Sequence, residues 1–381
     1  MSIIYDYIVI GAGFTGLQIA LQLKNEGAQI ALLDNQEQPG GSHRSGSGPL
    51  GSFDRGFRFY PASDIAEQVL HEIESTMGYS QIYSIKENSP ITFSTNEFKD
   101  FLGFGEETPY AYDLMRPFLT DKRCELSKPF NEIIFDYQNK LGDVFHPRSM
   151  VTKINFESDA VNVIVNGSKT FKARQVVYAA HIKDLLPLVP AEFLPSKFRQ
   201  RLGKAHVVTA ICLDLLHDQV VSERENLHVL QGNQKEELVP CFGLFQRPFE
   251  KDGKMVQLSQ WMIFIPRNQS EEPEETVSLL KHLKRQIKRA YPNALDQVSA
   301  ERIFVPECMG LSETLKSQGE LVKGQDERLW VASPELNNFP QLLGSTLQSR
   351  WILSHLGFYS GSLAQGPLEP DSSHIETEIN L

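Results

Sequence analysis

The feature that most constrains this chain is a glycine-rich loop set between an apolar strand and a helix near the N-terminus. Residues 5–10 are apolar and β-branched, as expected of a strand buried on both faces of a parallel sheet. Glycines follow at once at positions 11, 13 and 16, and residues 17–23 then carry apolar side chains at helical spacing. The order strand, glycine loop, helix predicts the start of a βαβ unit that binds a dinucleotide.

Each part of this motif has a physical role in holding a diphosphate. Gly11 makes the tight turn, Gly13 allows the pyrophosphate to approach the backbone, and Gly16 allows the helix to pack closely on the strand. Phe14 and Thr15 lie in the first helical turn, whose free amides and positive dipole end favour an anion. The glycine spacing alone would also fit a surface loop, and the flanking strand and helix favour nucleotide binding.

A second apolar strand, residues 29–33, follows the helix and ends at Asp34. In a dinucleotide-binding unit, an acid about 20 residues after the glycine loop accepts hydrogen bonds from the hydroxyls of an adenosine ribose. Asp34 is the candidate for this contact, and Asn35 lies beside it. A phosphorylated ribose would be repelled at this position.

The next segment contains Gly40, Gly41, Ser42 and Arg44. Its order of acid, short polar loop, Gly-Gly and Arg resembles the extended FAD signature of the flavin amine oxidase superfamily. That superfamily includes amine oxidases, protoporphyrinogen oxidases, phytoene desaturases and, more distantly, UDP-galactopyranose mutases. The resemblance implies FAD as the cofactor, with the two glycines passing the diphosphate and Arg44 neutralising its charge. Ser42 stands where many members carry a first Arg, and a flexible Gly/Ser linker is the alternative.

Two further segments extend the resemblance. Residues 53–60 are similar to the family's Asp-x-Gly stretch beside the flavin ring, and Arg58 would be the charge nearest to that ring. Arg58 is the candidate catalytic residue, because an arginine there could hold an anionic substrate or stabilise reduced flavin. A surface arginine packed on an aromatic ring is the alternative. Val151 maps to the family's adenine-contacting strand, or is an ordinary strand valine.

The C-terminal part resembles the family's last flavin strand and the helix that follows it. Family members end the strand in Ala-Gly-acid, whereas this chain has Ser333 and Pro334, so that only Glu335 could supply the carboxylate. Leu342 and Leu343 lie at the start of the helix, whose amides in the family face the flavin pyrimidine.

Composition and charge exclude several classes of partner. The net charge of -11 argues against nucleic acid and anionic membranes. No apolar window is long enough to span a bilayer, and no secretory leader is recognised. The four cysteines are far apart without a CxxC motif, so we predict neither a metal site nor a disulfide framework, and expect reduced thiols in the cytoplasm. The sequence leaves the oligomeric state open.

The predicted fold class is α/β, with a Rossmann-type FAD-binding domain and a discontinuous α+β substrate domain. Aromatic residues are dense in the first substrate segment, where they either line a pocket or pack in a core. The predicted boundaries are residues 1–78, 145–190 and 323–360 for the FAD-binding domain, 79–144 and 191–322 for the substrate domain, and 361–381 for a disordered tail.

Three functional classes remain open. The leading prediction is an FAD-dependent oxidoreductase that moves hydride from a C–N or C–C bond of a small-molecule substrate to flavin N5, and Arg58 would suit an anionic group on that substrate. The second is a non-redox flavoenzyme similar to the sugar mutases. The third, suggested by the missing acid before Glu335, is a degenerate nucleotide-binding protein without catalysis.

Overall fold

The computed structural model describes residues 3–44, 48–51, 53–56, 59–105, 108–231, 239–311, 326–336 and 341–361. Within it the chain forms two compact units. Unit 1 comprises Met1–His43, Asn131–Ala205 and Glu313–Leu381, and unit 2 comprises Arg44–Phe130 and His206–Ser312. Residues 44–78 thus group with unit 2, although the sequence analysis assigned them to the FAD-binding domain. Sheets and helices occur in both units, which confirms the mixed α/β class.

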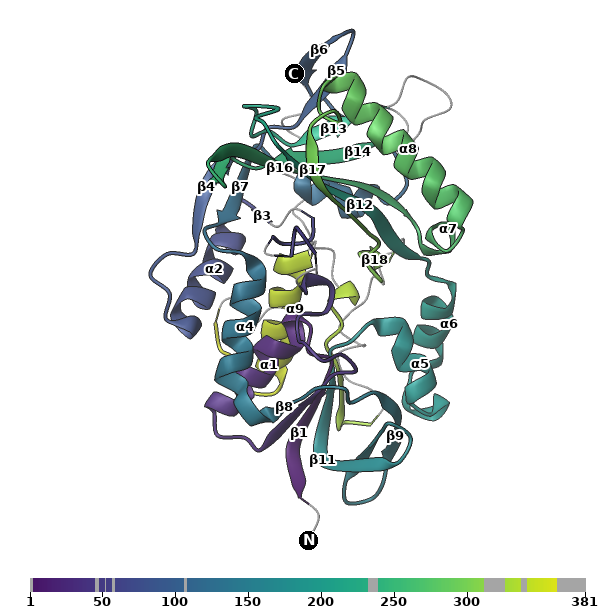
Figure 1. Cartoon of the computed structure of the whole chain (residues 1–381). Coiled ribbons are helices and arrows are strands. Elements are labelled where there is room, and N and C mark those ends of the chain that lie inside the picture. Colours follow the sequence, from purple (N-terminus) through teal and green to yellow (C-terminus); the bar gives the residue numbers. More distant parts are fainter. Residues whose placement is uncertain are drawn as a thin grey trace. The chain divides into compact units, whose positions relative to one another are not determined.

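A mostly parallel sheet forms the centre of unit 1 (Figure 1). Its strands lie in the order β8-β2-β1-β11-β10-β9, and β19 pairs with the last part of β11. Strand β10 is antiparallel to both of its neighbours, whereas the other pairs are parallel. The strands are β1 Ile4–Ile10, β2 Ile30–Leu33, β8 Phe145–His146, β9 Val151–Phe156, β10 Val161–Val165, β11 Lys169–Tyr178 and β19 Leu329–Val331.

The helices of unit 1 include one that is buried along most of its length. They are α1 Phe14–Asn25, α4 Phe130–Leu141 (in this unit from Asn131 onward), α5 Leu185–Leu188, α6 Ser196–Lys204 and α9 Gln341–His355. Helix α9 is buried from Leu342 to Leu353 and packs against α1 (Figure 1). Their contact is partly polar: Gln18 Nε2 donates to Thr346 Oγ1 (3.1 Å), and Ser349 Oγ donates to Gln18 Oε1 (3.2 Å). These bonds satisfy side chains that are costly to bury unpaired.

Unit 2 is built on a largely antiparallel sheet in the order β17-β12-β16-β14-β13-β5-β6, with β15 on β16 and β18 on β12. A smaller sheet has the order β3-β7-β4. The strands are β3 Phe59–Pro61, β4 Tyr83–Glu87, β5 Ile91–Ser94, β6 Glu97–Asp100, β7 Lys122–Leu126, β12 Val207–His217, β13 His228–Leu230, β14 Cys241–Phe245, β15 Phe249–Lys251, β16 Lys254–Pro266, β17 Val298–Phe304 and β18 Gly310–Leu311.

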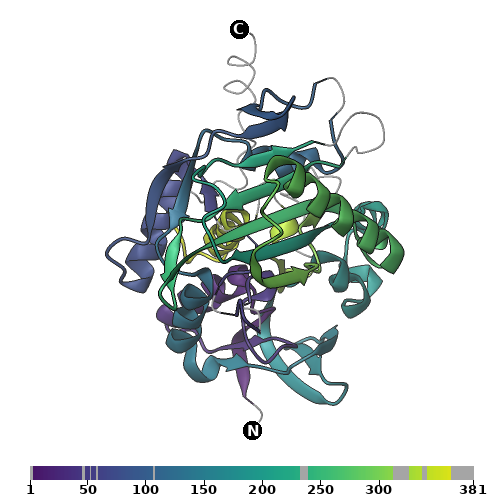
Figure 2. The same ribbon diagram turned by 45° about the horizontal axis from the view of Figure 1, so that its top comes forward.

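Helix α8, Pro273–Ala290, lies across one face of the large sheet (Figure 2). Its buried Leu283 and Ile287 join a core cluster with Leu213 of β12 and Trp261 of β16. The remaining helices of unit 2 are α2 Asp64–Met77, α3 Tyr112–Met115 and α7 Arg267–Ser270. No helix in the described residues combines the length and apolarity needed to cross a bilayer.

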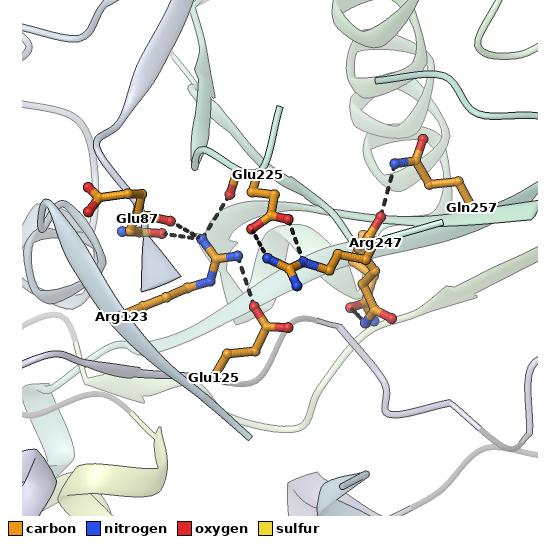
Figure 3. A network of polar contacts seen from close by, with 9 residues as sticks. Glu87, Arg123, Glu125, Glu225, Arg247 and Gln257 are labelled. Atoms are coloured by element: carbon orange, nitrogen blue, oxygen red, sulfur yellow. Dashed lines mark hydrogen bonds and ion pairs between the residues drawn. The ribbon is translucent and has the colours of Figure 1, made fainter. Parts of the chain in front are cut away.

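A buried arginine ties the small sheet to a loop of unit 2 (Figure 3). Arg123 of β7 is 2% exposed, and its Nη1 donates to the carbonyls of Glu87 and Glu225 at 2.8 Å each. Its Nη2 donates to Glu125 Oε2 at 2.9 Å. Glu225 also accepts from Arg247, and this hydrogen bond is the main reason that the pKa of Glu225 is lowered. We expect a structural role for this network, because Nη1 and Nη2 of Arg123 both donate to groups of the protein.

Candidate functional site

The first glycine loop folds at the carboxyl end of β1 in a form that two of its glycines make possible. Gly11 has φ 101°, and a Cβ there would lie 2.8 Å from the amide nitrogen of Ala180. A Cβ on Gly16 would lie 1.9 Å from the carbonyl oxygen of Gly11. A side chain at either position would therefore clash with backbone, which agrees with the turn and packing roles inferred from the sequence.

The second glycine pair crosses the first loop. Gly40 forms a parallel bridge with Gly13 and donates its amide to the carbonyl of Ala12 at 2.7 Å. A Cβ on Gly41 would lie 3.2 Å from Gly13 Cα, so the two segments pass each other with little space for a side chain. A Cβ on Gly13, in contrast, would meet nothing within 4 Å. The crossing leaves a surface of bare backbone at the carboxyl edge of the parallel sheet, where such sheets bind ligands.

Asp34 is fastened to this loop by backbone hydrogen bonds. Its Oδ2 accepts from the amide of Ala12 at 2.6 Å, and its Oδ1 accepts from the amide of Gln36 at 2.8 Å. Since a carboxylate oxygen has two lone pairs, each can also accept a ribose hydroxyl. Asn35, the adjacent candidate, is exposed.

The side chains of Phe14 and Thr15 point into the core of unit 1. Phe14 is 2% exposed and packs edge-on against Tyr137 at 5.6 Å between ring centroids. Burial raises the pKa of Tyr137 to about 12. Thr15 Oγ1 donates to the carbonyl of Ser345 at 3.3 Å. Any contact of these two residues with a nucleotide would therefore use their backbone amides.

Glu335 lies on a short 3-10 turn, Pro334–Leu336, directly after β19. Nδ1 of His181 donates to its Oε1 at 2.9 Å, and the two side chains are 13% and 11% exposed. Oε2 of Glu335 is buried and has no hydrogen-bond partner among the residues that the structure describes. A buried acceptor without a donor is uncommon in folded proteins, and a ligand hydroxyl at this position would satisfy it.

Neighbouring groups fix the backbone around this pair. Tyr178 donates its hydroxyl to the carbonyl of His181 at 2.8 Å, and Ser333 donates its hydroxyl to the carbonyl of Ala180. Burial, followed by the charges of Asp184 and Glu335, raises the pKa of Tyr178. Ser333, one of the two residues that replace the family's Gly-acid, thus bridges the ends of two parallel strands.

The other predicted residues lie in different surroundings. Leu342 and Leu343 are 1% and 2% exposed in the first turn of α9, and Val151 is half-buried at the start of β9. Ser42 is exposed, with its Oγ 3.3 Å from Nδ1 of His43. Arg44 is half-buried and belongs to unit 2. Arg58, the candidate catalytic residue, lies outside the described residues.

His181 is not among the residues that the sequence singled out. The available signal was its position: it follows β11 at the carboxyl edge of a parallel sheet, where polar side chains meet ligands. Its partner Glu335 was chosen only through the family resemblance.

The crossed glycine segments, the fastened acid and the parallel sheet fit the adenosine and diphosphate parts of FAD. They define the class of protein as one that binds a dinucleotide cofactor. Residues 6–86 match the family described as FAD dependent oxidoreductase, and residues 121–305 match the family described as flavin containing amine oxidoreductase. The chain belongs to the flavin amine oxidase superfamily, and its cofactor is FAD.

Solved structures share the fold at low sequence identity. Putrescine oxidase bound to putrescine aligns with a TM-score of 0.68 and 11% identity, over 93% of this chain and 99% of that one. A putative protoporphyrinogen oxidase from Exiguobacterium sp. 255-15 gives 0.68 and 11% over the same shares. Cyclohexylamine oxidase from Brevibacterium oxydans IH-35A gives 0.67 and 13%, over 93% and 100%. No curated protein matches the sequence.

Proposed function

We propose that the protein oxidises a small molecule at a C–N or C–C bond, with hydride transferred to N5 of FAD. The observation that carries the proposal is the close crossing of Gly40 and Gly41 with Gly13. Beside it lies Asp34, whose carboxylate is held by a hydrogen bond from the amide of Ala12. Hydride acceptance is the chemistry that FAD supplies when bound. The work of the protein is then to hold the cofactor and the substrate.

Specific groups of unit 1 are proposed to bind FAD. The exposed backbone at Gly13 and Gly41 would approach the diphosphate, and Asp34 would accept from the adenosine ribose. Oε2 of Glu335 would accept a hydroxyl of the ribityl chain, with His181 holding the carboxylate in place. Further proposed cofactor contacts come from Gly11, Phe14, Thr15, Gly16, Asn35, Gly40, Ser42, Arg44, Val151, Leu342 and Leu343.

The substrate is proposed to be a small amine or a related reduced compound that carries an anionic group. Two of the structural neighbours are named for the oxidation of amines, putrescine and cyclohexylamine. The anionic group is proposed from Arg58, whose planar guanidinium suits a carboxylate. Four free cysteines, three of them buried, agree with the proposed cytoplasmic location, where thiols stay reduced.

The test uses the purified full chain under anaerobic conditions. We expect a yellow protein that releases FAD on denaturation, and whose flavin absorbance is bleached by amines that carry a carboxylate. Arg58→Ala should raise KM with the flavin content unchanged, and Arg58→Lys should restore part of the loss. A colourless protein, or activity that requires prior reduction by dithionite, would refute the proposal.

A further inference from the structure

Unit 2 contains a partly buried arginine that has no acidic partner in the described part of the chain. Arg55 makes no ion pair there, and its Nε is buried without a hydrogen-bond partner. Its guanidinium lies 5.8 Å from the centroid of the Phe304 ring. An arginine in such a position is costly unless something else accepts from it, because each buried donor loses its hydrogen bonds to water.

The nearby carboxylate of Asp214 is already engaged by another arginine. Arg302 lies 5.9 Å from the centroid of the same Phe304 ring, and its Nη2 and Nε are 2.7 and 2.9 Å from Asp214 Oδ2. Asp214 is 0% exposed, and Oδ2 also accepts from the amide of Gly56 at 3.3 Å. Arg302 therefore neutralises the charge of Asp214. The positive charge of Arg55 then has no carboxylate paired with it among the described residues.

Arg302 also holds the loop that carries Arg55. Its Nη1 donates to the carbonyls of Leu50 and Phe53 at 2.7 and 3.1 Å, and its Nη2 donates to the carbonyl of Asp54 at 2.5 Å. Gln260 of β16 donates to the same Asp54 carbonyl at 3.0 Å. The backbone next to Arg55 is thus fixed from the sheet, which favours a preorganised binding group over a mobile surface side chain.

The charges around Arg55 are predominantly positive. Burial lowers its pKa, and the charges of Arg302 and then Arg44 lower it further, whereas Asp214 acts in the opposite direction. Arginine nevertheless stays protonated in proteins, so the repulsion between these positive charges remains in the folded protein and destabilises it. An oxyanion bound to Arg55 would reduce this repulsion.

We propose that Arg55, with Arg44 nearby, forms an oxyanion-binding site of unit 2 that takes a phosphate or carboxylate group. The guanidinium packs beside Phe304 and can offer a planar set of donors to such a group. The oxyanion is proposed to be an acidic group of the substrate, so this inference deepens the proposed function and rests on it.

The test compares the full-length protein with Arg55→Gln, Arg55→Lys and a matched control, Arg267→Gln. Arg267 is an arginine of the same unit with a 45% exposed side chain, paired with Glu271. FAD affinity is measured by titrating the apoprotein, and affinity for inorganic phosphate is measured on the FAD-loaded and apo forms at constant ionic strength. Loss of a charge-assisted contact should weaken phosphate binding by about tenfold or more in Arg55→Gln, and by less in Arg55→Lys.

The two affinities decide the proposal together. A tenfold loss of phosphate affinity with FAD affinity unchanged supports an oxyanion site that serves the substrate. A tenfold loss of FAD affinity would overturn it. If both affinities of Arg55→Gln equal those of Arg267→Gln, the proposed site is wrong. A wild-type protein that binds no FAD would refute the proposed function, while the phosphate measurement on the apoprotein would still decide the role of Arg55.

Discussion

Oε1 of Glu335 lies 2.9 Å from Nδ1 of His181, although 154 residues separate the two in the sequence. The pair forms because β11 and β19 are parallel neighbours, so that the segments leaving their carboxyl ends meet. His181 fixes one oxygen of the carboxylate and leaves the other, Oε2, as a buried acceptor. The structure thereby supplies a carboxylate at this edge although the family's usual acidic position is Pro334 in this chain.

Replacing Glu335 with Gln should weaken FAD binding by about tenfold or more, since a hydrogen bond to a charged group contributes about 1.5–3 kcal/mol. The measurement is a fluorescence titration of the apoprotein with FAD. Glu192→Gln, at an exposed position of unit 1, is the matched control and should bind like the wild type. Equal affinities for Glu335→Gln and the control would remove Glu335 from the cofactor site.

Gly13 and Gly16 should respond differently to alanine. Gly13 has φ -66°, and its added Cβ meets nothing within 4 Å, so Gly13→Ala should leave the stability of the apoprotein within about 0.5 kcal/mol of wild type. The same methyl group would occupy the approach proposed for the diphosphate, so FAD affinity should fall. Gly16→Ala should destabilise the apoprotein itself, because its Cβ would lie 1.9 Å from a backbone oxygen. Full FAD affinity in Gly13→Ala would contradict the proposed approach.

Acidic pH should destabilise unit 2 through two buried histidines. Burial lowers the pKa of both His217 and His228 to about 4, from an ordinary value of 6.5. The unfolded chain therefore takes up protons first, and stability is lost as the pH falls from about 6.5 towards 4. Each histidine should account for about 3 kcal/mol by pH 4.

Denaturant unfolding at pH 7, 5.5 and 4.5 measures this loss. His228→Leu should show a smaller decrease between pH 7 and 4.5 than the wild type. The control His71→Asn alters a side chain that is 66% exposed and should retain the wild-type decrease. Imidazole NMR signals of His217 and His228 that titrate near pH 6.5 in the folded protein would show the explanation to be wrong.

Gly243 of β14 should not tolerate alanine. A Cβ there would lie 2.0 Å from the ring of Trp261, which is 0% exposed and donates its Nε1 to Ser259 Oγ at 2.9 Å. Because this ring is fixed in the core, Gly243→Ala should lower the free energy of unfolding by about 3 kcal/mol. Gly203→Ala, in helix α6 with open space around its Cβ, should instead raise it by about 0.5–1 kcal/mol. Calorimetry or urea unfolding compares the two, and equal effects would contradict the packing argument.

Local patterns in the sequence predicted several elements closely. Residues 161–165 alternate as a strand should and form β10, and the amphipathic spacing at 275–291 corresponds to α8, Pro273–Ala290. The apolar run of the next strand of unit 1 covers only residues 176–180, whereas β11 begins at Lys169. Its first half is polar, and it is a strand because it pairs with β10. This pairing is a hairpin in which Val165 lies opposite Lys169, and the exposed Lys169 and Thr170 fall outside the apolar run that local hydrophobicity detects.

The glycines of the candidate site could be predicted because their roles depend on the backbone. Gly11 and Gly16 follow from their spacing between a strand and a helix, and a side chain at either position would clash with backbone. The inward direction of Phe14 and Thr15 was not predictable, since their partners Tyr137 and Ser345 lie far away in the sequence. The same reason applies to His181 beside Glu335.

The pairing of β11 with β19 has a consequence for synthesis on the ribosome. Strand β1 ends at Ile10 and is made early, whereas β19 begins at Leu329 and α9 follows it. Until these late segments emerge, the end of β11 has an open edge, and Gln18 of α1 lacks its partners Thr346 and Ser349. Open strand edges promote aggregation of nascent chains. The sheet and the helix packing of unit 1 are therefore completed only after β19 and α9 have been made.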